Sequence, residues 1–432
     1  MDILNKIKKP VIKETFLYTI SGGTSKAISF LVLPLISNYL VPQELGMAAN
    51  LDVLVSILSL LGGLAIVNGL PYFYYNRSKR DVAILISTLI GLVLLLNLIL
   101  SIVIFLLKGI IFQYLYLNTK FQLISIFIVI SLLLSNINLI TLRLDEKPLR
   151  YLFFNLSSTI LYVLFLLYFV VYLRLEGAGK IYSLFISNVI IAIVHIAYLY
   201  KKGYLLFKIR KSELIELLKF GIPLLPHSLS FWIKSGLDKI LLTTYCGLGI
   251  NGLYSMAMSF GAIYSIFVTA FNDAFVPYLQ KKMSLISKET EYIEKLNLVK
   301  LSYKIYSFFL FLYLLIVPLC WLIIKYILDE KYISSFQFIP WILLSLTINA
   351  FYSLVIQYPY SMKKTFGLGI ITISGSIIQC ILTFILIKYI GENGIKISLV
   401  LGSLITTLVV WWYSNKVYPM PWISFITKKI EK

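Results

Sequence analysis

Four charged side chains interrupt two stretches of sequence that are otherwise apolar enough to cross a membrane. Lys26 lies in the segment SGGTSKAISF, and Lys234, Asp238 and Lys239 lie within the long apolar run 217–257. A charge near the middle of a bilayer costs about 2.5–3.5 kcal/mol on insertion scales, so such residues usually face a water-filled cavity or an opposite charge. We therefore interpret Lys26, Lys234 and Lys239 as candidates to bind an anionic substrate group in a cavity.

Each of these lysines also has a purely structural interpretation. Lys26 can extend its ammonium group to the nearer membrane surface, as long basic side chains commonly do. Lys234 and Asp238 are four residues apart and share one face of a helix, so they can simply neutralise each other. Lys239 lies about two helical turns beyond the position that an internal repeat makes equivalent to Lys26, so both are predicted to face the same cavity.

Carboxylates within the apolar stretches are few, and we take three as candidates to bind a coupling proton or cation. They are Asp52, Asp238 and Asp273. Asp238 has the alternative of forming a charge pair with Lys234. Asp52 and Asp273 lie near the predicted ends of their helices, where ordinary interfacial carboxylates are also common.

The composition is that of an integral membrane protein. Hydrophobic residues make up 59% of the 432 positions and charged residues 13%, and the mean hydropathy is +0.89. This leaves no room for a soluble catalytic domain, and we expect no enzyme activity. Motifs for nucleotide binding and metalloprotease chemistry are absent, and three scattered cysteines give no metal-ligand spacing, so we expect neither a metal nor an organic cofactor.

The hydropathy pattern predicts an all-α polytopic protein with about twelve transmembrane helices, since a helical span needs about 20 mostly apolar residues. The predicted spans are 15–41, 46–74, 82–107, 121–142, 150–173, 178–200, 214–244, 248–279, 299–325, 334–361, 367–390 and 394–414.

Basic residues are distributed unequally between the two sides of these spans. The side that holds both termini carries most of the 39 lysines and arginines, and the opposite side carries only a few, among them Arg174 and Lys180. The positive-inside rule therefore predicts that both termini are cytoplasmic. The net charge of +20 is explained by these loops and by contact with anionic lipid, so we expect no nucleic-acid partner.

A weak internal repeat relates the two halves of the chain. Sliding the sequence on itself aligns Leu35 with Leu241, Tyr39 with Tyr245, Gly46 with Gly252, Pro71 with Pro277 and Tyr72 with Tyr278. Chance agreement is an alternative in so biased a composition, but the span count independently gives six helices to each half. We predict two parallel six-helix lobes, residues 1–207 and 208–432, around a central cavity that holds the substrate.

One run of sequence resembles a known family. The run FGIPLLPHSLSFWIKSGLDKILLTTYCGLGINGLYSMA is similar to the seventh and eighth spans of bacterial polysaccharide-export flippases, with their Gly-x-Pro start, mid-helix Asp followed by a basic residue, and Gly-x-Tyr opening of the next helix. The segment LPLISNYLVPQELGMAAN resembles the matching end of the first span. The family belongs to the superfamily of multidrug and toxin extrusion (MATE) antiporters and the lipid II flippase.

The resemblance implies a flippase of the bacterial cytoplasmic (inner) membrane. Its expected substrate is an undecaprenyl-pyrophosphate-linked oligosaccharide, an O-antigen or capsule repeat unit, which it carries to the outer leaflet by alternating access. Cationic residues of the first and seventh helices line the cavity in the family, and here those helices carry Lys26, Lys234 and Lys239. Membrane lipids and the polysaccharide polymerase machinery are the other partners implied, and coupling to a proton or sodium gradient stays open.

Two other classes of function remain as alternatives. A cation-coupled MATE-type multidrug antiporter would need acidic residues deep in the cavity to hold cationic drugs, whereas the deepest charges here are mostly lysines. A membrane scaffold without transport activity would leave the intramembrane charges unexplained. Lysines replace the usual arginines of the flippase family, so a phosphate would meet point charges rather than bidentate guanidinium groups.

Overall fold

The computed structural model describes residues 17–18, 21–75, 77–285, 291–362 and 364–422. The described residues are almost entirely helical and contain no strand. They divide into two compact units, Met1–Ser255 and Met256–Lys432. The two lobes 1–207 and 208–432 stay a prediction from the internal repeat, and the seventh predicted span, 214–244, packs with the first unit.

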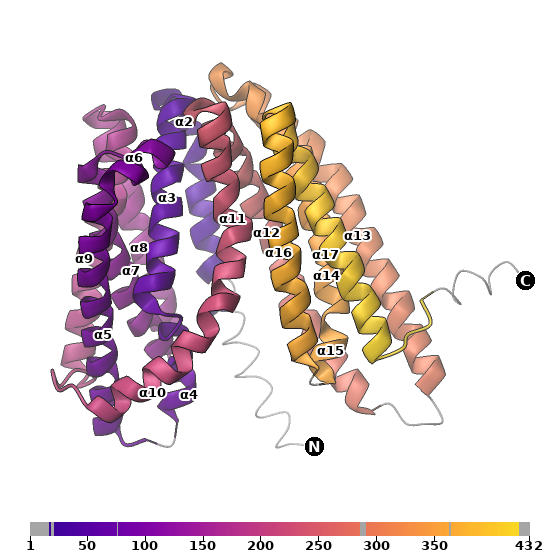
Figure 1. Cartoon of the computed structure of the whole chain (residues 1–432), viewed down its shortest axis with the longest axis horizontal. Helices are drawn as coiled ribbons and strands as arrows, with labels where there is room; N and C mark the ends of the chain where they lie inside the picture. Colours follow the sequence, from indigo (N-terminus) through magenta and orange to yellow (C-terminus); the bar gives the residue numbers. More distant parts are fainter. Residues whose placement is uncertain (1–16, 19–20, 76, 286–290, 363, 423–432) are drawn as a thin grey trace, which may run out of the picture. The chain divides into compact units, whose positions relative to one another are not determined.

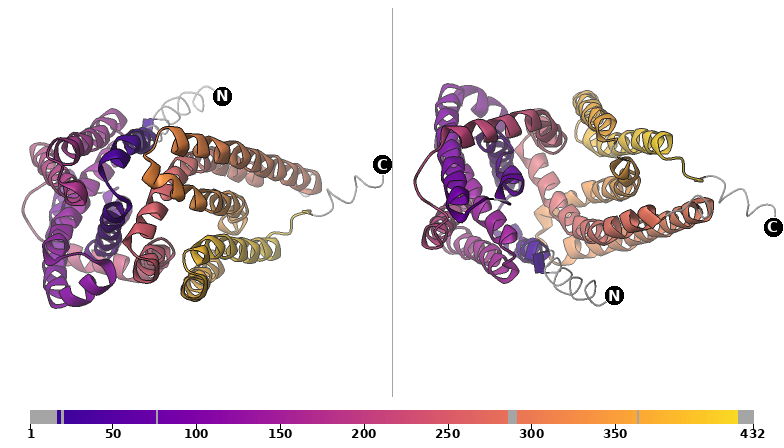
Figure 2. Two further views of the ribbon diagram at one scale, coloured as in Figure 1. Left: turned by 90° about the horizontal axis from the view of Figure 1, so that it is seen from above. Right: turned by 90° about the horizontal axis from the view of Figure 1, so that it is seen from below.

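The first unit is built from helices that run side by side, as the end-on views show (Figure 2). Along the chain they are α2 (Leu33–Tyr39), α3 (Pro42–Gly63), η1 (Val67–Gly69), α4 (Leu70–Tyr74), α5 (Lys79–Leu106), α6 (Lys108–Leu115), α7 (Thr119–Leu144), α8 (Pro148–Leu166), η2 (Leu167–Tyr172), α9 (Glu176–Lys201), α10 (Lys211–Gly221), η3 (Ile222–Leu224), α11 (Leu225–Cys246) and the start of α12 (Leu248–Leu285). Figure 1 labels most of them. A helical stretch at residues 21–31 precedes α2.

The second unit contains the remainder of α12 and the helices that follow it. These are α13 (Glu291–Tyr326), η4 (Glu330–Phe338), α14 (Ile339–Val355), α15 (Gln357–Ser361), α16 (Thr365–Ile390) and α17 (Asn393–Val417). Helix α17 packs on both α14 and α16. Buried hydroxyl groups join them, as between Ser345 and Ser403 at 2.6 Å and between Thr383 and Ser398 at 3.0 Å.

The prediction of a polytopic helical membrane protein is confirmed. Ten helices of the described chain are long and apolar enough to cross a membrane, and the bent pair Lys211–Leu224 and Ser228–Cys246 makes an eleventh. The predicted first span, 15–41, lies partly outside the described residues, and its described part is helical at 21–31 and in α2.

Local sequence signals fix where the helices of the first unit begin. Pro42 starts α3, and the Glu44 carboxylate accepts a hydrogen bond from the Val41 N–H at 2.9 Å. Ser78 and Asn118 cap α5 and α7 by accepting hydrogen bonds from backbone N–H groups three residues later. These caps satisfy donors that a helix start leaves unpaired.

A polar cluster joins the end of α4 to the segments that follow α7 and α9 in the first unit. The Asp145 carboxylate, in the loop between α7 and α8, accepts hydrogen bonds from the hydroxyl groups of Tyr74 at 2.5 Å and Tyr204 at 2.7 Å, and it pairs with Lys147. Burial acts to raise the pKa of Asp145, but Lys147 and the two hydroxyl groups outweigh it and hold the pKa below its usual value of 3.8. The cluster therefore stabilises the fold only while Asp145 is ionised.

We expect this cluster to make the protein sensitive to acid. A carboxylate whose pKa is lowered by folding contributes stability above its unfolded pKa and loses that contribution as the pH falls through the folded value. The thermal midpoint of the purified protein should fall as the pH is lowered through about 4 and below. Asp145→Asn should lower the midpoint at neutral pH and flatten its acid dependence, whereas Glu146→Gln, which changes an exposed neighbour, should keep the wild-type profile. An unchanged profile in Asp145→Asn would show that the cluster contributes no stability.

Candidate functional site

Helix α3 packs on α11, and polar side chains form hydrogen bonds across the contact. Asp52, Ser56 and Ser59 are spaced three and four residues apart and so share a face of α3. The indole N–H of Trp232 on α11 donates a hydrogen bond to the Ser56 hydroxyl oxygen at 2.9 Å. Further along, the Thr243 hydroxyl donates to the Asn50 side-chain oxygen at 3.0 Å. We call this line of contacts the α3/α11 seam.

Asp52 of α3 and Lys239 of α11 both lie within electrostatic range of Lys180 of α9, and we call these three residues the charge cluster. Lys180 interacts electrostatically with the Asp52 carboxylate and with the Lys239 ammonium group. The hydroxyl group of Tyr162, on α8, is also within electrostatic range of Asp52. With all three groups ionised the cluster holds one more positive than negative charge, so it has a net attraction for an anion.

Lys234 and Asp238 lie elsewhere on α11. They interact electrostatically with each other, and Asp238, only 4% exposed, also accepts a hydrogen bond from the Tyr254 hydroxyl of α12. This arrangement gives Asp238 two stabilising neighbours in the folded chain. Of the two predicted roles for Asp238, the local contacts therefore favour the charge pair.

The side chains of Lys26 and Asp273 are exposed, as is that of Asp52 on α3. Lys26 has an exposed side chain on the helical stretch 21–31, one residue after Ser25, which receives a hydrogen bond from Asn155 of α8. Asp273 is exposed on the part of α12 that belongs to the second unit. The structure thus places Asp52 and Lys239 each within electrostatic range of Lys180, places Lys234 within electrostatic range of Asp238, and gives Lys26 and Asp273 no ion pair among the described residues.

The starts of α3 and α12 touch backbone to backbone at two glycines that the internal repeat aligns. A Cβ atom on Gly46 would lie 2.0 Å from the carbonyl oxygen of Leu248, and one on Gly252 would lie 1.8 Å from the carbonyl oxygen of Pro42. Positions 42 and 248 are also equivalent in the repeat, so the contact is symmetric. This symmetry supports the internal repeat. The sequence matches alone could also have arisen by chance.

Buried amides complete this contact. The side-chain N–H groups of Asn251 lie 2.9 Å from the side-chain oxygen of Asn50 and 3.3 Å from the carbonyl oxygen of Gly46. Asn50 in turn donates to the carbonyl oxygen of Leu115 on α6 at 2.8 Å. Because all these groups are shielded from water, separating α3 from α12 would leave hydrogen bonds unmade unless water enters.

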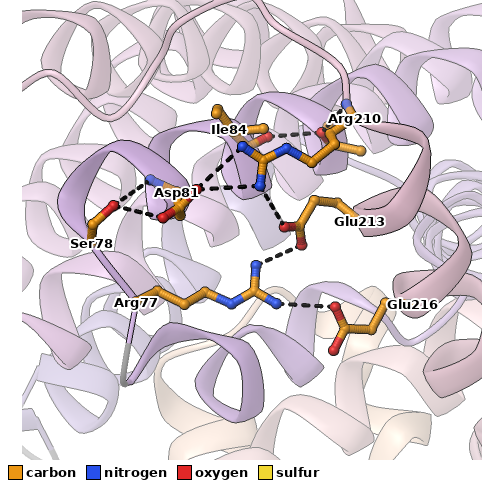
Figure 3. A network of polar contacts seen from close by, with 8 residues as sticks. Arg77, Ser78, Asp81, Ile84, Arg210, Glu213 and Glu216 are labelled. Carbon is orange, nitrogen blue, oxygen red and sulfur yellow. Dashed lines mark hydrogen bonds and ion pairs between the residues drawn. The ribbon is translucent and has the colours of Figure 1, made fainter.

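An ionic network fixes α10, the helix that leads into α11. Arg77, in the loop before α5, donates hydrogen bonds to Glu213 at 2.6 Å and Glu216 at 3.0 Å. Arg210, at the start of α10, binds Asp81 of α5 at 3.2 Å (Figure 3). Its backbone N–H also donates to the hydroxyl group of Thr88. Figure 1 shows α10 running across the ends of the upright helices before the chain turns into α11.

We expect the central carboxylate of this network, Glu213, to contribute strongly to stability. Its side chain is 7% exposed and lies between Arg77 and Arg210. Glu213→Ala should lower the free energy of unfolding by about 1–3 kcal/mol, because the partly buried Arg77 loses a charged partner. Glu216→Ala removes a carboxylate that is 51% exposed and binds the same arginine. It should lower the free energy of unfolding by less than about 1 kcal/mol. Equal thermal midpoints for the two variants in detergent would contradict this ranking.

The comparisons with known proteins identify the family. The sequence profile of the polysaccharide biosynthesis protein family matches residues 11–283, which is more than half of the chain. The chain belongs to the polysaccharide biosynthesis protein family. This confirms the resemblance to polysaccharide-export proteins that the seventh and eighth spans carry.

Two curated relatives of this family member come from Haemophilus influenzae. A protein of the Lsg locus is 25% identical over 424 residues, covering 94% of this chain and 98% of the relative. An uncharacterized membrane protein is also 25% identical, over 438 residues, covering 98% of both chains.

Solved structures show the same fold. The lipid II flippase MurJ in an inward closed conformation matches 93% of this chain and 87% of that chain, with a TM-score of 0.72 and 14% identity. An inward-facing MATE family transporter of the MOP superfamily matches 93% of this chain and 94% of that chain, with a TM-score of 0.58 and 15% identity. The family member is therefore a multi-span membrane protein with a transporter fold.

Lys180 is the site residue that sequence reasoning missed. The distribution of basic residues places it on the less basic side of the membrane, although the predicted span 178–200 includes it, and α9 begins earlier still, at Glu176. Its position inside a span was the available signal. Asp52 lies far from Lys180 in the sequence, and no sequence pattern predicts that the two residues lie near each other in the fold.

Proposed function

We propose that this protein is a flippase that carries an undecaprenyl-pyrophosphate-linked oligosaccharide, an O-antigen or capsule repeat unit, from the cytoplasmic to the outer leaflet. The observation that carries the proposal is the cluster of Lys180, Lys239 and Asp52 on membrane-spanning helices of a polysaccharide biosynthesis family member. A net positive cluster on helices of this kind suits the pyrophosphate of a lipid carrier better than it suits a cationic drug.

The lysines would bind the pyrophosphate as point charges. Charge-assisted hydrogen bonds from ammonium groups to phosphate oxygens are among the stronger polar contacts in proteins. Asp52 lies within electrostatic range of Lys180 and offsets part of the positive charge while the site is empty, and the incoming pyrophosphate would take over as the counter-ion of the lysines. Lys26 and Lys234 extend the cationic surface in this proposal, and Asp52, Asp238 or Asp273 would carry a proton or sodium ion if transport is coupled to one.

The membrane potential favours the proposed direction of transport. With both termini in the cytoplasm of a bacterium and the protein in its inner membrane, an anionic head group moves outward down the electrical gradient. The gain is about 2.3 kcal/mol per charge for each 100 mV. The contact of α3 with α12 at Gly46 and Gly252 would separate when the head group leaves, in keeping with alternating access around a fixed site.

Complementation tests the proposal directly. The gene is expressed in a bacterium that lacks its own repeat-unit flippase and carries the polysaccharide cluster that accompanies this gene. Surface polysaccharide should appear with the gene and be absent without it, at equal levels of lipid-linked precursor. Lack of surface polysaccharide together with raised drug resistance would instead support the MATE-type antiporter, and neither phenotype would support a scaffold without transport activity.

A further inference from the structure

A cavity opens at the end of the α3/α11 seam, inside the first unit. Its volume is about 260 Å³, and its walls include Ser59 of α3, Asn136 of α7 and Ser228 of α11. Apolar side chains, among them Val67 and Leu133, form other parts of the wall. The volume lies slightly below the lower end, about 300 Å³, of typical small-molecule sites. The cavity therefore fits one ring of a small polar molecule rather than a whole oligosaccharide.

The three polar side chains in this wall have unused hydrogen-bonding capacity. Among the residues that the structure describes, Ser59, Asn136 and Ser228 make no side-chain hydrogen bond to protein. Together they offer two hydroxyl groups and one amide, which can both donate and accept. The two serines are half-buried and Asn136 is exposed, so all three polar groups are accessible to an occupant of the cavity that has polar groups of its own.

The backbone around the cavity is irregular although it belongs to a predicted span. Helix α3 ends at Gly63 because Leu64 and Ala65 adopt positive φ angles of 46° and 56°. The break is held by the end of α10, where a Cβ atom on Gly221 would lie 2.4 Å from the carbonyl oxygen of Leu64. Non-helical backbone at membrane depth persists only where it is buried in protein or lines a hydrated cavity, and transporters commonly place substrate at such broken helices.

The cavity and the charge cluster lie along the same face of α3. Ser59 is seven residues from Asp52, which corresponds to about 10 Å along a helix. Between them, Ser56 and Trp232 are joined by their hydrogen bond. Trp232 and Ser228 are four residues apart and share a face of α11, so the indole lies about one turn from the cavity. A head group with its pyrophosphate at Lys239 would thus extend a sugar toward Ser59.

From this placement we propose that the cavity binds one sugar residue of the lipid-linked substrate, the one nearest the pyrophosphate. The inference rests on the proposed function and adds where the sugar is recognised. Ser59, Asn136 and Ser228 exchange hydrogen bonds with sugar hydroxyl groups, and the apolar wall at Val67 and Leu133 covers the C–H face of the ring. These residues therefore select the sugar, while Lys180 and Lys239 bind the pyrophosphate that all such substrates share.

Binding of two lipids to the purified full-length protein tests this division of roles. The probes are undecaprenyl pyrophosphate bearing the oligosaccharide made by the accompanying gene cluster, and undecaprenyl pyrophosphate without sugar, with affinities measured by native mass spectrometry. Wild type should bind the sugar-bearing lipid more tightly, by on the order of 10-fold, since two or three net hydrogen bonds are gained. The combined variant Ser59→Ala, Asn136→Leu, Ser228→Ala should lose this preference and bind the sugarless lipid as wild type does.

Binding of the sugarless lipid also reports whether the combined variant is folded. As a second variant, Ser59→Leu fills the cavity at a single position and should weaken only binding of the sugar-bearing lipid. Retention of the wild-type preference in both variants would overturn the sugar subsite and leave the proposed function intact. Failure of wild type to bind either lipid would overturn the proposed function and the subsite with it.

Discussion

Gly252→Val should abolish export of surface polysaccharide while the protein stays in the membrane at its normal level. A Cβ at this position would lie 1.8 Å from the carbonyl oxygen of Pro42, far below the 3.0 Å that real Cβ atoms keep. The obstacle is backbone rather than a flexible side chain, so α3 and α12 must move apart. We expect the state in which α3 and α12 touch to be destabilised by about 3 kcal/mol or more, which is the upper end of overpacking costs. The population of that state should then fall roughly 100-fold.

Gly46→Val should have the same effect, because it meets the carbonyl oxygen of Leu248 at 2.0 Å across the same symmetric contact. Gly369→Val is the matched control, since nothing lies within 4 Å of a Cβ at that helical glycine of α16. Export is scored as surface polysaccharide in the complemented strain, and protein level by immunoblot of the membrane fraction. Normal export with Gly252→Val would show that the transport cycle does not need α3 and α12 in contact.

Lys239→Ala should reduce export about 10- to 100-fold, because a charge-assisted hydrogen bond to phosphate contributes roughly 1.5–3 kcal/mol. Lys180→Ala should have a similar effect, since the two ammonium groups act on the same cluster. Lys239→Arg keeps the positive charge and should retain most export. Lys388→Ala, which removes an exposed lysine of α16, is the control for loss of charge alone.

Substrate affinity separates a binding role of these lysines from a structural one. Lys239→Ala should weaken binding of both the sugar-bearing and the sugarless lipid, while the thermal midpoint of the ligand-free protein changes little. If Lys239→Ala exports normally, or if it binds both lipids as wild type does, the pyrophosphate is held elsewhere. Asp52→Asn should retain more export than Lys239→Ala. It removes the carboxylate near the lysines, whereas Lys239→Ala removes a group that contacts the phosphate in this proposal.

Much of the fold could be predicted, because each membrane-spanning helix needs a long apolar stretch that is visible in the sequence. Twelve apolar stretches were expected, and the described helices match them apart from the incompletely described first span and the bent seventh one. The bend arises at Pro223 and Pro226, and its angle of 44° could not be read from the sequence. Neither could α10, whose polar contacts to Arg77 and Asp81 depend on residues more than 100 positions away.

The candidate site was only partly predictable. Intramembrane charges are visible in any sequence, and this was sufficient to select Lys239 and Asp52. Their grouping with Lys180 depends on three helices packing together, which hydropathy does not encode. The cavity at Ser59, Asn136 and Ser228 could not be predicted for a simpler reason. Serine and asparagine are common in membrane helices and usually bond to the backbone of their own helix, as Ser87 and Ser183 do here.

The most direct test of the central claim is translocation in proteoliposomes that contain only the purified protein and the lipid-linked oligosaccharide. An enzyme or lectin added outside reports how much oligosaccharide faces outward over time. Wild-type protein should make substrate from the inner leaflet accessible, and Lys239→Ala and Lys180→Ala should slow this translocation at least about 10-fold. Equal rates for wild type and both lysine variants, or no translocation above protein-free liposomes, would contradict it.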